Sequence, residues 1–457
     1  MSSIKCKIIC VFIFCIIMSG CSISGEDNKG KLDQNQTYTL KVMYWNQQYF
    51  IQKYGNLFQA KYPNVELQVI PTDRLRQVGK NPNDELIKLI DEEKPDILLL
   101  NQEQYKMLSD QGRLYDLGSV FVQDDYEVST INQKVIDVLK DNSQSALFGL
   151  APTYMNQVIY YNRDLFDQYG IEYPSDQMTW EEILQLAQRF PSDALPDGER
   201  IYGFSRQFEH DPYSLIEQMA AVKGLVPAQN GELFIGSESW RAVFETVVNA
   251  LKSNAIYYPA NDQGQTMYES NEEYLKSNLF ITGKSAMTLS DYSLTGNIKE
   301  ASTVLKEIEP VNWDIVTSPV DELARDVNYG FSVREIFSID RDSSNTLPAI
   351  EFIKFIGSDE MAKVLSKSIG DLPSRSDYSI EYDGRKLDAF YKLNSRTNNE
   401  TALEQSQIVF NSTFRAIVNE ELRKVIIDDV PLESALTVIQ ERGQAALLST
   451  GLNQKEQ

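Results

Sequence analysis

The residues that could do covalent or metal chemistry are few. His210 is the only histidine among 457 residues, so a histidine-rich zinc site cannot form and a Ser-His-Asp triad would need this residue as its base. No G-x-S-x-G elbow, P-loop or G-x-G-x-x-G fingerprint occurs. The sequence therefore predicts no catalytic residue, no cofactor and no structural metal site. The cysteines all lie near the N-terminus, which leaves the remaining chain without a thiol: Cys6, Cys10, Cys15 and Cys21.

Acidic residues are abundant, but their spacing does not favour catalysis. Pairs such as Glu420-Glu421 and Asp428-Asp429 are adjacent, and neighbours on a helix or strand point apart. They are more typical of solvated faces than of the acid and nucleophile of a glycosidase. The segment 340–351 has acids at calcium-loop spacing, but Asn345 replaces the sixth-position glycine, so a turn is the better interpretation and calcium stays open. A net charge of −23 disfavours nucleic acid as a partner.

Polar side chains follow two expected strands. Strand patterns at 39–44 and 96–100 end in loops that are rich in amides, which can donate and accept hydrogen bonds at once and therefore suit hydroxyl groups. Ligands of open α/β sheets lie beyond the carboxyl ends of the strands. Amides are equally common in solvated loops. The candidates are Trp45, Gln47, Gln48, Gln102, Glu103 and Gln104.

The pattern that positions these loops alternates between strands and helices. We expect strands at 39–44, 65–70 and 96–100, with helices at 49–62 and 84–92 between them. A continuous apolar run at 97–100 is typical of a parallel strand that is covered on both faces. The fold class predicted is therefore α/β. Further helices are expected after the capping box Thr179-Trp180-Glu181-Glu182, near Pro348, and after Pro431.

The N-terminus carries a targeting pattern. Lys5 and Lys7 precede an apolar run at 8–18 that is too short to span a bilayer. The following Ser19-Gly20-Cys21 resembles the lipobox of bacterial lipoproteins, which implies cleavage before Cys21 and attachment of diacylglycerol to it. An ordinary signal peptide with an incidental cysteine is the alternative. We expect a signal peptide at 1–20 and a flexible lipid-anchored tether at 21–36, and no membrane-spanning segment after it.

Several segments together resemble the bacterial extracellular solute-binding proteins of family 1, which are the maltose-binding-protein-like receptors of ABC importers. Each segment is weak alone, and their order over about 400 residues carries the resemblance. The segments are Lys94-Pro95-Asp96-Ile97 with Gly112-Arg113-Leu114, Tyr160-Tyr161-Asn162-Arg163-Asp164, Phe280-Ile281-Thr282-Gly283-Lys284, Gly330-Phe331-Ser332-Val333, and Asp371-Leu372-Pro373-Ser374-Arg375.

This resemblance implies a type II periplasmic-binding-protein-like fold with two α/β lobes and a ligand cleft between them. Hinge crossings are expected at 149–153, just after Met287 and at 330–333. We expect 37–150 plus 288–330 to form the N-terminal lobe, and 151–287 plus 331–457 to form the C-terminal lobe.

The resemblance also implies contacts in the cleft. Asp211 would accept hydrogen bonds and Tyr213 would stack, although Asp211 with Pro212 could instead cap a helix. Relatives place a tryptophan after the strand ending near Met287, and this chain has Asp291 and Tyr292 there, which argues against maltodextrin as the ligand. The remaining candidates are Tyr154, Asn156 and Arg375, whose guanidinium could pair with a carboxylate of the ligand or of the protein.

The function implied is that of a lipid-anchored receptor on the extracellular face of a bacterial cell membrane. It would be a monomer that captures a carbohydrate and delivers it to ABC permease subunits. We favour an oligosaccharide as this carbohydrate. An extracellular carbohydrate-active enzyme and a sensory receptor for a membrane kinase are the alternatives. A peptide, polyamine or glycerophosphodiester ligand also stays open.

Overall fold

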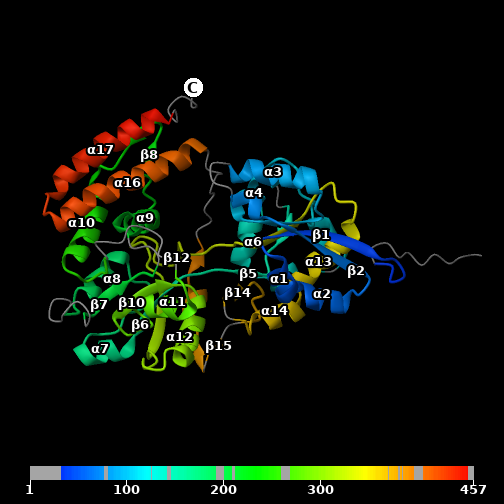
Figure 1. Cartoon of the computed structure of the whole chain (residues 1–457), viewed down its shortest axis with the longest axis horizontal. Coiled ribbons are helices and arrows are strands. Elements are labelled where there is room, and N and C mark those ends of the chain that lie inside the picture. Colours follow the sequence, from blue (N-terminus) through cyan, green and yellow to red (C-terminus); the bar gives the residue numbers. More distant parts are fainter. Residues whose placement is uncertain are drawn as a thin grey trace, which may run out of the picture.

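The computed structural model describes residues 32–76, 81–124, 126–140, 146–191, 200–207, 211–258, 268–368, 370–378, 381–382, 384–395 and 405–450. Figure 1 shows two α/β lobes, with short strands where the chain passes between them. The predicted α/β class is confirmed. Among the described residues, no helix is both long enough and apolar enough to cross a bilayer.

The first lobe is built on a five-stranded sheet with the order β2-β1-β3-β13-β4. The first three strands are parallel, and β13 runs antiparallel to both β3 and β4. The predicted strands at 39–44, 65–70 and 96–100 correspond to β1, β2 and β3. The strands are β1 (Tyr38–Tyr44), β2 (Val65–Pro71), β3 (Ile97–Leu100), β4 (Gly149–Leu150) and β13 (Ile336–Ile339).

Helices cover this sheet, and their apolar residues join its core. They are α1 (Gln47–Phe50), α2 (Asn56–Lys61), α3 (Pro82–Glu93), α4 (Gln102–Asp110), α5 (Gly118–Gln123), α6 (Gln133–Leu139), α13 (Thr346–Ile356) and α14 (Asp359–Leu365). A π-helical turn, η1 (Ile51–Gly55), joins α1 to α2, so the helix predicted at 49–62 is one helical stretch with a π turn inside it. Short 3-10 turns lie at η2 (Asp73–Arg76) and η3 (Val128–Thr130).

The second lobe is built on a four-stranded sheet with the order β11-β6-β10-β7. Its strands are β6 (Val158–Asn162), β7 (Tyr202–Ser205), β10 (Ser285–Ser290) and β11 (Trp313–Thr317). Its helices are α7 (Arg163–Tyr169), α8 (Trp180–Ala187), α9 (Pro212–Val222), α10 (Glu238–Lys252), α11 (Asn271–Ser277), α12 (Ser293–Val304), α16 (Gln405–Ile427) and α17 (Leu432–Ser449). The hairpin of β8 (Ala228–Gln229) and β9 (Glu232–Leu233) packs beside α17.

Helix starts lie where the sequence predicts them. Thr179 and Glu182 form the predicted capping box at the start of α8. Pro431 precedes α17, and Pro348 lies in the first turn of α13 in the other lobe.

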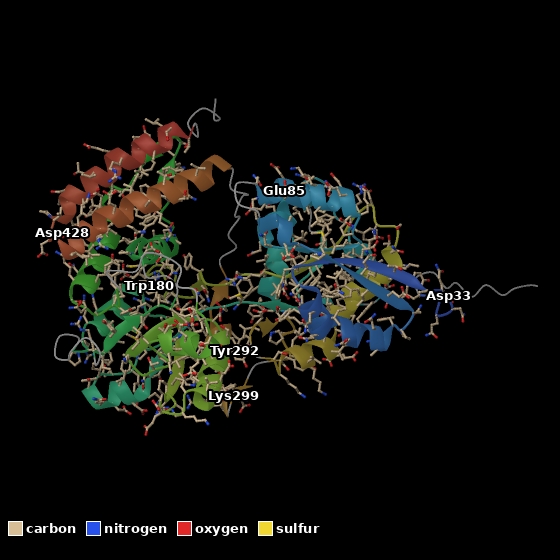
Figure 2. All side chains as sticks on the ribbon, viewed as in Figure 1. Asp33, Glu85, Trp180, Tyr292, Lys299 and Asp428 are labelled. Carbon is tan, nitrogen blue, oxygen red and sulfur yellow. The ribbon has the colours of Figure 1, made fainter. Side chains whose placement is uncertain are left out.

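The adjacent acids Glu420 and Glu421 differ from the prediction of a solvated pair, because Glu421 is only 4% exposed and bonds Lys424 and Arg442. Asp428 lies at the outer end of the second lobe, as expected for a solvated pair (Figure 2).

Short elements join the lobes. β5 (Thr153–Tyr154) pairs with β14 (Leu372–Pro373), and β12 (Val327–Asn328) pairs with β17 (Asn394–Ser395). The helix α15 (Ala389–Lys392) and the hairpin of β15 (Glu381–Tyr382) and β16 (Arg385–Lys386) complete this region. We call it the junction. Its interior is apolar, with Tyr154 against Phe331 at 5.1 Å and Tyr160 against Phe390 at 6.4 Å between ring centroids.

The predicted lobe boundaries after residue 287 are wrong. The segment 288–330, assigned to the first lobe, contains β11, which pairs with β6 of the second lobe. The segment after 331, assigned to the second lobe, begins with β13, which pairs with β3 of the first lobe. No crossing follows Met287, because β10 continues to Ser290 and leads into α12. Short buried strands do not reveal from their sequence which sheet they join.

The crossings predicted at 149–153 and 330–333 overlap two passages between the sheets, although residues 149–150 belong to β4 of the first sheet. β4 belongs to the first sheet and β6 to the second, so the chain passes between the lobes through 151–157. Residues 331–335 lead back to β13, and Met155 and Ser332 exchange backbone hydrogen bonds where these two crossings meet. A third passage, beyond Arg375, was not foreseen. It leads from the first lobe to α15, which packs beside β11.

Candidate functional site

Two exposed aromatic rings follow the carboxyl end of β1. Trp45 and Tyr49 are 39% and 42% exposed, and their ring centroids lie 4.8 Å apart. Both pack on the fully buried Tyr44, at 5.6 and 6.3 Å. The Asn46 side chain caps α1 by accepting from the Tyr49 amide at 2.9 Å, which fixes the loop between the two rings. The pair forms a supported apolar surface that a sugar ring could stack on.

A charged cluster lies beside these rings. The Lys53 ammonium is 2.8 Å from the Glu335 carboxylate and 5.7 Å from the centre of the Tyr49 ring. Glu335 also accepts hydrogen bonds from the hydroxyls of Tyr44 at 2.6 Å and Tyr54 at 2.7 Å. Burial lowers the pKa of Lys53, but the charge and hydrogen bond of Glu335 outweigh this and raise it, so Lys53 is ionised.

Asp371 extends the cluster towards the second lobe. Its carboxylate is 3.8 Å from Lys53 and accepts from the Thr153 hydroxyl at 3.3 Å. Burial raises the pKa of the Asp371 carboxyl; Lys53 opposes this shift, and the charges of Glu335 and Asp291 add to it. Asp291 belongs to the second lobe, so the raised pKa of Asp371 includes a small contribution from a charge on that lobe.

The elements that place this cluster are irregular ones. Lys53 lies on the π-helical turn η1, a feature often found at functional sites. Glu335 is at the end of the crossing that leads into β13, and Asp371 directly precedes β14. Thr153 lies on β5, which pairs with β14. The site is therefore assembled from several chain passages at the junction.

The polar candidates predicted in the first lobe differ in their contacts. Gln47 and Gln48 are exposed at the start of α1. Gln102 accepts from the Val333 amide at 3.4 Å and so touches the crossing. Glu103 accepts from Asn83 at 2.7 Å, and Gln104 forms a capping box with Asn101. Glu103 and Gln104 thus have local structural partners.

Tyr154 and Asn156 lie inside the junction, not on its surface. Both are 2% exposed. The Tyr154 hydroxyl accepts from Asn132 at 3.3 Å, and Asn156 donates to the Phe390 carbonyl at 2.6 Å and accepts from Asn328. The polar groups of these two side chains hold crossing segments together, and direct ligand contact by them stays a prediction.

Asp211 and Tyr213 lie at the start of α9. Asp211 caps the helix by accepting from the Ser214 amide at 3.1 Å, which confirms the structural alternative for this residue. It also pairs with Arg415 of α16 at 3.0 Å. The Tyr213 ring is 2% exposed and packs edge-on against Phe414 at 5.5 Å, so it presents no open face in this structure, and stacking on a ligand stays a prediction.

The last three candidates divide between two positions. Asp291 accepts from the Ser293 amide at 2.9 Å at the start of α12, and its charge adds to the shift that raises the pKa of Asp371. Tyr292 lies on the side of the second lobe towards the first (Figure 2), but it is 4% exposed and packs against Phe390, and stacking of its ring on a ligand stays a prediction. Arg375 turns into the first lobe, where it donates to the Gly357 carbonyl at 3.5 Å and approaches Asp377.

Of the predicted candidates, Trp45 lies beside a cluster that the sequence did not reveal, because it packs on Tyr49, whose ring is 5.7 Å from the Lys53 ammonium. The sequence did not reveal Lys53, Glu335 and Asp371 as a cluster. Lys53 and Glu335, for example, are 282 residues apart along the chain, so no local pattern links them. The Asp371-Leu372-Pro373 segment was noticed only as a family pattern. His210 lies outside the described residues, as does Cys21. Within the described ranges, no group of three or more His, Cys, Asp or Glu is arranged to hold a metal ion.

Comparison with known proteins gives the family. The model of the bacterial extracellular solute-binding protein family matches residues 44–363. The sn-glycerol-3-phosphate-binding periplasmic protein UgpB of Escherichia coli (strain K12) is 23% identical over 304 residues, which cover 64% of this chain and 65% of that protein. The match thus spans slightly less than two thirds of the relative's length.

Solved structures share the fold. A sugar transporter from Rhizobium etli in an open conformation superposes with a TM-score of 0.62 at 18% identity, covering 90% of this chain and 100% of that one. The ABC substrate-binding protein Lmo0181 from Listeria monocytogenes, in complex with cycloalternan, gives 0.59 at 19% identity, covering 90% and 99%. The two lobes are thus those of a type II periplasmic binding protein. With the family match covering well over half of its residues, this chain belongs to the bacterial extracellular solute-binding proteins.

Proposed function

We propose that this protein is the extracellular substrate-binding lipoprotein of an ABC importer, and that it captures a carbohydrate, an oligosaccharide, for a membrane permease. The observation that carries the proposal is the exposed Trp45–Tyr49 pair beside the Lys53–Glu335–Asp371 cluster. Sugar rings offer an apolar face and a rim of hydroxyls, and this arrangement offers an aromatic surface and fixed hydrogen-bonding groups next to each other.

The proposed mechanism depends on ligand contacts with both lobes. A ligand that contacts Trp45 and Asp371 of the first lobe and Asp291 of the second gains all its contacts only when the lobes are close together. Binding therefore shifts the population towards the closed form. The closed form would be the one that the permease recognises, while ATP is hydrolysed by other subunits. No reaction on the ligand is part of this proposal, and the protein would act as a monomer.

The proposed localisation is the outer face of the cell membrane. Cleavage before Cys21 and lipidation of its thiol would leave two acyl chains or more, enough for stable anchoring. The polar segment 21–36 would then act as the tether. Intact-mass analysis of the protein from membranes is expected to show the loss of residues 1–20 and the gain of diacylglycerol. An unmodified N-terminus in the secreted protein would contradict the anchor.

A thermal-shift screen over a glycan library tests the carbohydrate assignment. A specific ligand present at about 100 times its dissociation constant stabilises the folded state by about 2.7 kcal/mol, which is seen as a rise in the melting temperature. The hits are then incubated with the protein and analysed for products. Unchanged glycan supports a receptor, cleavage supports the enzyme alternative, and a blank across all carbohydrates contradicts the assignment.

A further inference from the structure

A single carboxylate joins the groups that surround the two exposed rings. One oxygen of Glu335 accepts from the Tyr44 hydroxyl at 2.6 Å. The other accepts from the Tyr54 hydroxyl at 2.7 Å and from the Lys53 ammonium at 2.8 Å. The Glu335 side chain is 15% exposed, so water competes weakly for these donors. Because hydrogen bonds to an ionised acceptor are roughly twice as strong as neutral ones, the three side chains are held in one network.

Two members of this network contact the exposed rings, Trp45 and Tyr49, which we call the platform. The ring of Tyr44 stacks on both, with interplanar angles of 30° and 16°. The Lys53 ammonium is 5.7 Å from the centre of the Tyr49 ring. Burial, followed by the charge of Glu335, raises the pKa of the Tyr44 hydroxyl far above the ordinary tyrosine value, so this hydroxyl remains a donor. Glu335 thus reaches the platform through Tyr44 and Lys53.

The same carboxylate belongs to a passage between the lobes. Glu335 ends the crossing 331–335, in which Ser332 exchanges backbone hydrogen bonds with Met155 of another crossing. The next residue begins β13, so the backbone of Glu335 is fixed by the first sheet on one side and by the paired crossings on the other. The network therefore connects the platform to the part of the chain that joins the lobes.

We infer that Glu335 is a positioning residue of the ligand site, which holds the platform in the orientation that binds a glycan. This inference rests on the proposed function and names a residue that sets the affinity. A ring that is fixed in advance costs less ordering free energy on binding than a mobile ring does. If the platform without this support is in the competent orientation for about a tenth of the time, the apparent dissociation constant rises about tenfold.

Tryptophan fluorescence of the ligand-free protein tests the positioning directly. The chain has four tryptophans, and the other three are buried, so acrylamide quenches Trp45 preferentially: Trp180, Trp240 and Trp313. Glu335→Gln keeps the size of the side chain but removes its charge and replaces one acceptor oxygen with an amide group. The Trp45 ring is 39% exposed, so its release should raise the quenching constant by about twofold.

Glu351→Gln is a matched control in the same lobe. The Glu351 side chain is 19% exposed, accepts from the Tyr62 hydroxyl at 2.7 Å and pairs with Lys354 at 3.0 Å, so this variant loses the same kinds of bond. Both variants should lower the melting temperature. Only Glu335→Gln should increase the quenching of Trp45, and only this variant should bind the hits of the glycan screen about tenfold more weakly.

Tyr44→Phe provides a second test if Glu335→Gln does not fold. It removes the hydroxyl that donates to Glu335 and keeps the ring on which the platform packs, so quenching should rise and affinity should fall in the same directions. If only this variant can be studied, unchanged quenching and affinity overturn the inference.

The results distinguish the positioning role from the proposed function. Quenching of Trp45 that is equal in Glu335→Gln, Glu351→Gln and the parent protein overturns the positioning role and leaves the importer role intact. A parent protein that binds no glycan in isothermal titration calorimetry overturns the proposed function, and the ligand role of Glu335 with it.

Discussion

At the scale of single residues, the site combines groups that stabilise the fold with groups that do not. Glu335 is bonded to Lys53, Tyr44 and Tyr54, so its charge is well compensated. Asp371 has weaker compensation, from Thr153 at 3.3 Å and Lys53 at 3.8 Å. Because its native pKa is raised, the folded state disfavours the ionised form of this carboxylate. Such a group is more easily explained by binding than by stability.

Asp371→Asn should therefore stabilise the ligand-free protein at neutral pH. A raised native pKa means that ionised Asp371 costs stability at any pH above that native value. This cost disappears as the pH falls through the native pKa towards the ordinary aspartate value. We expect the variant to melt about 1–2 °C higher at pH 7, with the difference shrinking towards pH 4. Calorimetric melting at several pH values measures this, and a variant less stable than the parent at pH 7 would contradict it.

Trp45→Ala should separate binding from folding at the same scale. The ring is 39% exposed, so its removal should lower the melting temperature only slightly, while the loss of a stacking surface should weaken glycan binding by about 10- to 100-fold. Trp45→Phe serves as the control, because it keeps a smaller aromatic face and should retain most of the affinity. Unchanged affinity in the alanine variant would exclude Trp45 from the site.

Sequence reasoning reached only part of this residue-level picture. Trp45 and Asp291 could be predicted as candidates because each lies just beyond a strand that alternation or family pattern revealed. Lys53 and Glu335 were not found, because their partnership depends on how η1 and the crossing before β13 meet in space. The burial of Tyr213 was not predictable, since a motif cannot show that Phe414, some 200 residues later, covers the ring.

At the scale of elements, the sequence predicted helix starts and strands reliably, but it did not reveal how closely the elements pack. The capping box of α8 and the strands of the first sheet follow directly from residue spacing. The π turn η1 does not, because its sequence also fits an ordinary helix. The need for glycine at position 203 is likewise not evident from the sequence. An ideal Cβ at this position of β7 would lie 2.0 Å from the carbonyl oxygen of Ala187, at the end of α8.

Gly203→Ala is accordingly expected to destabilise the second lobe severely. The clash is with backbone atoms, which cannot turn aside as a side chain can, so β7 and α8 must separate; we expect a loss of about 3 kcal/mol or more. Gly236→Ala is the control, because the nearest atom to its Cβ would be the Gln440 side-chain oxygen at 3.9 Å. Urea unfolding followed by circular dichroism compares the two, and similar midpoints would contradict the prediction.

At the scale of the whole molecule, one side chain links the lobes in an unusual way. Lys134 of α6, in the first lobe, donates to the carbonyl of Tyr391 at 3.0 Å and to that of Leu393. Tyr391 lies in α15 and Leu393 directly follows that helix, on the second lobe's side of the junction. Burial lowers the pKa of Lys134. The link therefore places a partly desolvated ammonium between the lobes.

Lys134→Met should loosen this link while keeping the length of the side chain. We expect the ligand-free variant to sample a wider range of distances between the lobes, and its glycan affinity to change by a factor of about 2–10. Spin labels on α3 and α10, measured by pulsed electron resonance, report the distance distribution. Lys140→Met, an exposed change just beyond the end of the same helix, is the control. Identical distributions in both variants would show that Lys134 does not restrain the lobes.

The two-lobed class was predictable because many weak motifs agreed in order, but the boundaries were not. Strand β13 inserts between β3 and β4, which lie in an earlier part of the chain. During synthesis, both flanking strands must therefore wait with open edges for a partner that appears more than 180 residues later. Long-range pairing of this kind slows folding. A nascent or truncated chain that stops before Ile336 would expose these edges to self-association, so the cell gains from holding the chain unfolded until β13 is available.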